Sequence, residues 1–173
     1  ILLPHSHTDI GYTHDPLVAC ELHKRFIDRA IELCERTAGW PEGARFRWTI
    51  EVLVVLEKWL ETASARQKHR LIAQIRDGNI ALGVRYTHGG LLYAPGDIDW
   101  EIERVGNLLD EVKAPLEAGC LIQNDVNGFP RRMARAYYER LGQRRFAMGL
   151  NTTMGVTPVP RSSAFEWDLG GGR

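Results

Sequence analysis

Two histidines and an aspartate occupy every second position near the start of the sequence, in the order His5, His7 and Asp9. Side chains two residues apart in extended backbone point to the same side, so they can converge on one point. Imidazole nitrogen and carboxylate oxygen are both ligands of Zn²⁺, at about 2.0–2.2 Å. We therefore predict that His7 and Asp9 bind a metal ion. His5 is either a further ligand or a supporting hydrogen-bond partner, and the alternative is a polar loop whose histidines are satisfied locally.

A second carboxylate, Asp125, follows the apolar residues Leu121 and Ile122. Three roles suit it: metal ligand, nucleophile, or cap of the helix that follows. Capping is the common role of Asp before a helix. Against it, Asp125 lies five residues before Pro130, which is too early for a cap if Pro130 opens that helix.

Short apolar runs alternate with longer segments of helical periodicity, which predicts repeated βα units and a parallel sheet or barrel. Asp15 and Pro16 indicate the start of the first helix. The expected strands cover residues 1–5, 45–49, 80–84, a run ending at 122, and 146–150; the expected helices cover 17–38, 52–60, 66–75, 100–116 and 133–141. Such an α/β chain would form about two thirds of a β/α barrel, whose chemistry takes place at the carboxyl ends of the strands. His7 and Asp125 both follow expected strands.

The composition excludes several classes of function. Lys plus Arg and Asp plus Glu both total 22, so the balance favours neither nucleic acid nor an anionic membrane as partner. The longest apolar run, 52–56, is far shorter than the roughly 20 residues of a membrane span. Three cysteines without a CxxC pair indicate reduced thiols and a cytoplasmic protein. Because the chain begins inside an apolar run and ends on Gly-Gly-Gly-Arg, we expect a fragment of a longer protein, truncated at both ends.

Four segments, in order, resemble glycoside hydrolase family 38, the class II α-mannosidases. Residues 5–12 (HSHTDIGY) resemble the opening HSHxDxGW/Y motif of the family, and residues 46–52 (FRWTIEV) look like its second-strand segment. Residues 125–130 (DVNGFP) resemble the nucleophile loop of its bacterial branch. Residues 148–152 and 158–167 look like a later segment of the same branch. The resemblance thus extends over essentially the whole chain.

The resemblance implies a parallel, seven-stranded β/α barrel that holds one Zn²⁺ and cleaves α-mannosidic bonds with retention. By position, His7 and Asp9 would be zinc ligands, and Asp125 would be both a zinc ligand and the catalytic nucleophile. The last histidine ligand and the general acid/base carboxylate come later in family members, so we expect these 173 residues alone to bind zinc weakly and to turn over little.

Two aromatic side chains and one carboxylate are further candidates. Trp48, at the expected end of the second strand, either stacks on a sugar face or belongs to the core. Tyr12 would line the mouth of the pocket. Glu51 is expected to start the following helix, where a carboxylate interacts favourably with the helix dipole.

Other functions fit parts of the pattern. A polysaccharide deacetylase would require a downstream HxxxH motif, and an amidohydrolase would use His5 and His7 with further histidines at the fourth and fifth strands; the sequence shows neither feature. A truncated, non-catalytic relative that binds only metal or sugar is the alternative from another class.

Overall fold

The computed structural model describes residues 4–8, 14–87, 95–114, 121–123, 131–141 and 146–148. Along the chain its elements are α1 (Pro16–Thr37), the 3₁₀ helix η1 (Glu42–Ala44), β1 (Trp48–Val52), α2 (Leu53–Leu60), α3 (Ala65–Arg76), β2 (Ile80–Arg85), α4 (Pro95–Glu111), β3 (Leu121–Gln123), α5 (Arg131–Leu141) and β4 (Phe146–Met148). Asp9, Tyr12 and Asp125, which the sequence singled out, lie outside the described residues.

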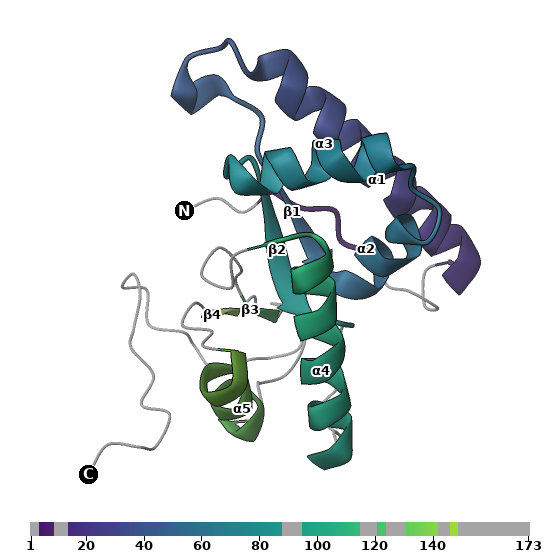
Figure 1. Ribbon diagram of the computed structural model, residues 1–173, viewed down its shortest axis with the longest axis vertical. Helices are drawn as coiled ribbons and strands as arrows, with labels where there is room; N and C mark the ends of the chain where they lie inside the picture. Colours follow the sequence, from purple (N-terminus) through teal and green to yellow (C-terminus); the bar gives the residue numbers. More distant parts are fainter. Residues whose placement is uncertain are drawn as a thin grey trace, which may run out of the picture.

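Strands alternate with helices, and every described strand pairing is parallel. β1 pairs with β2, and β3 pairs with β4 (Figure 1). The segment before α1 joins the same arrangement through a parallel bridge between His5 and Thr49 of β1. The expectation of an α/β chain with parallel strands is therefore confirmed.

Helix boundaries follow the capping residues in the sequence. Asp15 accepts a hydrogen bond from the backbone N–H of Leu17 (2.8 Å), so α1 begins at Pro16 as predicted. At the start of α3, Ser64 and Gln67 form a reciprocal capping box. Gly78, with φ of 72°, follows the end of α3 in the left-handed region that glycine tolerates best.

α4 begins at Pro95, five residues earlier than the predicted start. Proline suits the first turn of a helix, where its missing N–H leaves no bond unmade. The buried side of α4 includes Ile98, Ile102 and Val105, whereas Trp100 is 54% exposed. The sequence-based boundary started at Trp100, which is outside this apolar face.

β1 lies three residues later than predicted. The prediction placed a strand at 45–49, but residues 48–52 form it, and all five are buried. Arg45 and Arg47 are exposed, which agrees with the high cost of burying an unpaired charge. This shift corrects the expectation for Glu51, which lies inside β1 and does not start the helix that follows.

A bulge separates the two halves of the β1–β2 pairing. Ile50 pairs with Leu82, but Val52 pairs with Arg85, so β2 contains one residue more than β1 in this interval. An extra residue reverses the side on which the following side chains lie. Arg85 therefore lies on the same side of the pair as Val52.

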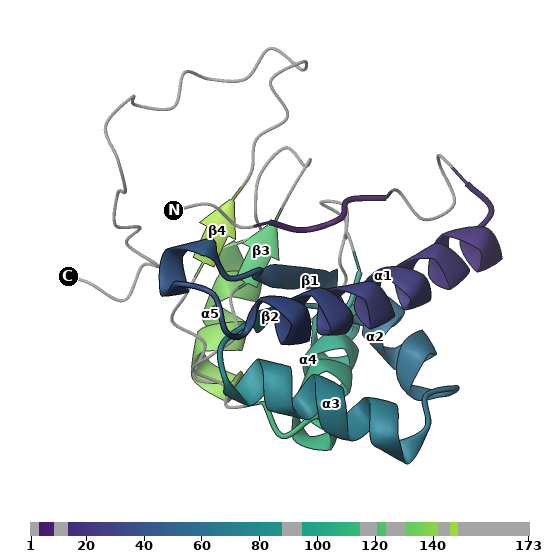
Figure 2. The same ribbon diagram turned by 90° about the horizontal axis from the view of Figure 1, so that it is seen from above.

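The core lies between the strands and the helices around them. Figure 2 shows α3 and α4 on the same side of the β1–β2 pair. Asp28 of α1 accepts hydrogen bonds from Trp59 Nε1 of α2 (3.0 Å) and from Gln67 Nε2 of α3 (3.2 Å), which joins the three helices. The largest fully buried apolar side chains of this core are Trp59, Tyr137, Ile27, Ile31, Ile50, Leu53, Leu56, Leu71, Ile80, Leu82 and Leu109.

Two of the three cysteines lie within the described residues. Cys20 and Cys34 are both free. In the part of the chain that the structure describes, no helix has the length and apolar character needed to cross a membrane.

Candidate functional site

The N-terminal segment runs parallel to β1 and brings its histidines to the carboxyl end of that strand. The backbone N–H of Thr49 donates to the carbonyl oxygen of Pro4 (2.8 Å), and His5 bridges to Thr49. Both segments rise by about 3.3 Å per residue in the same direction. His7, two residues beyond His5, therefore lies beside Glu51, two residues beyond Thr49.

The side chains of this segment meet at one carboxylate. His7 Nδ1 lies 3.1 Å from Glu51 Oε1 and 3.0 Å from Glu51 Oε2. His5 Nδ1 lies 3.2 Å from the same Oε2, although its orientation does not make a hydrogen bond. The two imidazole rings pack edge to face, with their centroids 6.3 Å apart. We call His5, His7 and Glu51 the His–Glu cluster.

The sequence named Glu51 only as the expected first residue of a helix, and its contact with the two histidines was missed. Its side chain is 3% exposed, whereas those of His5 and His7 are 24% and 27% exposed. The sequence feature that could have indicated this contact is the two-residue spacing of Thr49 and Glu51, which places both side chains on the same side of a strand. That signal is only readable once residues 48–52 are known to be the strand.

Gly83 allows β2 to approach the backbone of Glu51. A Cβ atom at this position would lie 2.1 Å from the carbonyl oxygen of Glu51 and 2.9 Å from its carbonyl carbon. Contacts this short do not occur between real atoms, so glycine is required for the close approach at the bulge. The backbone around the buried carboxylate thus depends on a residue of the neighbouring strand.

The predicted metal ligands are only partly described. His7 is within the described residues and belongs to the His–Glu cluster, whereas Asp9 and Asp125 are outside them. Within the described ranges, no group of three or more His, Cys, Asp or Glu side chains could hold a metal ion. The His–Glu cluster is therefore not a complete metal site, and the predicted ligand set stays a prediction.

Trp48 lies in the hydrophobic core. It is 7% exposed and belongs to the same buried cluster as Ile50 and Val52. Because it opens β1 instead of ending it, it lies at the opposite end of the strand from Glu51. Of the two roles that the sequence left open for Trp48, this position favours the core.

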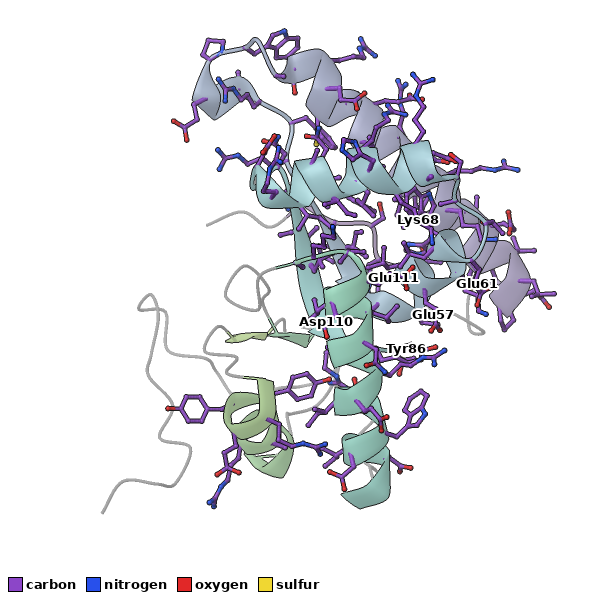
Figure 3. The ribbon with its side chains drawn as sticks, viewed as in Figure 1. Glu57, Glu61, Lys68, Tyr86, Asp110 and Glu111 are labelled. Carbon is purple, nitrogen blue, oxygen red and sulfur yellow. The ribbon has the colours of Figure 1, made fainter. Side chains whose placement is uncertain are left out.

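A second polar group lies between β2, α2 and α4. Tyr86 Oη donates to Glu57 Oε2 (2.6 Å), and Arg104 forms an ion pair with Glu57. Figure 3 shows Tyr86 and Glu57 close together. Burial, followed by the negative charge and hydrogen bond of Glu57, raises the pKa of Tyr86 to about 12. The half-exposed Trp100 packs edge-on against Tyr86, with ring centroids 5.0 Å apart. This group joins α2 and α4.

A buried ion pair connects β2 to α4. Arg85 Nε donates to Glu101 Oε1 (2.8 Å), and both side chains are 2% exposed. The backbone N–H of Tyr86 donates to the same oxygen (3.0 Å). These bonds depend on the bulge in β2, which places Arg85 on the side of the pair where α4 lies.

Comparisons with known proteins identify no relative of this chain. No protein-family model, no curated protein and no solved structure matches the chain.

Proposed function

We propose that the chain is part of a zinc-dependent, retaining glycoside hydrolase of the family 38 type, which cleaves α-mannosidic bonds. Its parallel βα units would then belong to the seven-stranded β/α barrel of that family. The proposal rests on the ordered motifs in the sequence together with one structural observation. That observation is the position of His7 and its contact with a buried carboxylate.

His7 lies at the carboxyl end of β1, where βα folds carry their active sites. Its Nδ1 faces Glu51 at 3.0 and 3.1 Å. Histidines that bind a metal through one ring nitrogen commonly donate the other N–H to a carboxylate. The surroundings of His7 are those expected for a metal ligand.

Zinc fits the chemistry of the predicted donors. One imidazole nitrogen from His7 and carboxylate oxygens from Asp9 and Asp125 are ligand types that Zn²⁺ accepts. When bound, the ion would orient the mannose hydroxyls and polarise them. The cation would also favour the ionised form of a neighbouring carboxylate.

Asp125 would act as the nucleophile. One of its oxygens would attack the anomeric carbon, and the bond from that carbon to the leaving oxygen would break as the leaving group takes up a proton. Water would then attack the same carbon, lose a proton and release Asp125 as a carboxylate. Two inversions at one carbon retain its configuration. The general acid/base is assigned to no residue of this chain.

The first test is the metal content of the purified chain by mass spectrometry, after mild chelation and reloading with zinc. We expect the wild-type chain to bind up to about one zinc, weakly held in the absence of the later ligand, and His7→Ala and Asp9→Ala to bind none. His14→Ala is the matched control, because His14 is an exposed histidine outside the predicted ligand set. A folded wild-type chain that takes up no zinc would contradict the proposed site.

The second test addresses the reaction. The protein expressed from the whole reading frame is incubated with an aryl α-mannoside and, separately, with a fluorinated mannosyl fluoride that traps a glycosyl-enzyme. We expect release of the α-anomer of mannose and a mannosyl adduct on Asp125. Release of acetate from an acetylated glycan, without mannoside cleavage, would instead establish the deacetylase alternative.

A further inference from the structure

The buried carboxylate of Glu51 requires a partner. Its side chain is 3% exposed, and moving an ionised carboxylate out of water costs several kcal/mol unless it is paired and hydrogen-bonded. Both oxygens lie within 3.1 Å of His7 Nδ1, and His5 Nδ1 is 3.2 Å from one of them. The pairing connects segments 44 residues apart in the sequence.

An ionised carboxylate can only accept hydrogen bonds, so a hydrogen bond to His7 requires a proton on Nδ1. In a neutral imidazole the lone pair is then on Nε2. This tautomer is the one that binds a metal through Nε2. A carboxylate in this position selects the protonation state of the ligand and also holds the plane of its ring.

We propose that Glu51 is a positioning residue of the metal site, which holds His7 in the Nδ1–H tautomer, so that the lone pair that would bind the metal is on Nε2. The inference rests on the proposed function in that it takes His7 as a zinc ligand. Glu51 acts through His7 and does not itself coordinate the metal.

Two alternatives to this role make different predictions. If Glu51 were a direct zinc ligand, its substitution would abolish zinc binding. If Glu51 were a purely structural carboxylate, its substitution would lower folding stability but would leave the His7 tautomer of the folded protein unchanged. The tautomer and the zinc affinity must therefore be measured together.

The test uses Glu51→Gln, which keeps the size of the side chain and removes its charge. Glu57→Gln is the matched control, because the Glu57 carboxylate is also largely shielded from solvent, at 12% exposed, but contacts Tyr86 and Arg104 instead of a histidine. Zinc affinity is measured by competition with a chelator. The His7 tautomer is measured by nitrogen-15 NMR of the zinc-free protein at mildly alkaline pH.

We expect Glu51→Gln to weaken zinc binding by about 10- to 100-fold, as loss of such a supporting group typically does, and to populate both tautomers of His7. Glu57→Gln should change neither. An unchanged His7 tautomer in folded Glu51→Gln would overturn the positioning role. Complete loss of zinc binding by the same folded variant would also overturn it, in favour of Glu51 as a direct ligand.

Failure of the proposed function gives a different result. A wild-type chain that binds no zinc, or a His7→Ala variant that binds it normally, would contradict the metal site, while the tautomer of zinc-free His7 would still report on Glu51. Where Glu51→Gln does not fold, Glu51→Asp replaces it, since its shorter side chain keeps the charge but withdraws the carboxylate from Nδ1. The same shift in tautomer is expected, and its absence would again overturn the positioning role.

Discussion

At the scale of single residues, neighbours on one strand have different roles because alternate side chains face opposite sides. Trp48 and Ile50 belong to the apolar core, whereas Glu51 contacts the two histidines. The same five-residue strand therefore contributes both to the stability of the protein and to its candidate site.

Replacing Trp48 with alanine should destabilise the protein by about 3–5 kcal/mol, because a large buried side chain leaves a cavity. The measurement is the free energy of unfolding from denaturant titration. Trp40→Ala is the control: Trp40 is 54% exposed, so its loss should change stability by about 0.5 kcal/mol or less. Equal effects of the two substitutions would argue against the core role of Trp48.

At the scale of elements, the bulge in β2 has two consequences. It brings Gly83 against the backbone of Glu51, and it places Arg85 beside Glu101 of α4. A local irregularity in one strand thus affects both the candidate site and the packing of a helix.

Gly83→Ala should destabilise the protein by about 1–3 kcal/mol, because the added Cβ overlaps the carbonyl oxygen of Glu51 and the strands must separate. Thermal unfolding, followed by circular dichroism, provides the measurement. Gly43→Ala is the matched control, since a Cβ at Gly43 meets no atom within 4 Å. Gly83→Ala with wild-type stability would show that the two strands are not this close.

Removing one partner of the Arg85–Glu101 ion pair, as in Arg85→Met, should lower the free energy of unfolding by about 3–5 kcal/mol, because the remaining charge is then buried without its partner. The double variant Arg85→Met with Glu101→Leu should recover most of that loss. Additive effects of the two substitutions in a double-mutant cycle of unfolding free energies would contradict this coupling.

At the scale of the whole molecule, stability should decrease at alkaline pH. Burial raises the pKa of the Cys34 thiol from 9.0 to about 11, and burial together with Glu57 raises that of Tyr86 from 10.0 to about 12. In the unfolded chain both groups lose their protons at lower pH than in the folded protein. Their contribution to stability is complete below the unfolded pKa values and is lost as pH rises through the folded ones.

We therefore expect the free energy of unfolding to decrease between about pH 9 and pH 12. Cys34→Ala should flatten the first part of this decrease, and Tyr86→Phe should flatten the last part. In the folded protein, alkylation should modify the partly exposed Cys20 faster than the buried Cys34. A free energy of unfolding that rises with pH over this range would contradict the raised pKa values of Cys34 and Tyr86.

Sequence patterns predicted local features of the fold well. The cap at Asp15 and the alternation of strands with helices were both readable, because periodicity and capping depend on residues close together in the chain. The three-residue shift of β1 was not readable, since the apolar run 52–56 continues from the strand into α2 without a polar boundary.

The candidate site divides in the same way. The alternating His5 and His7 could be recognised from their spacing alone, because two-residue periodicity in extended backbone places side chains on one side. The partnership of His7 with Glu51 and the burial of Trp48 required the tertiary structure. Both depend on how the N-terminal segment and β1 are aligned with each other, and a shift of one residue in that alignment would reverse which side chains meet. No local pattern specifies an alignment between segments that lie 44 residues apart.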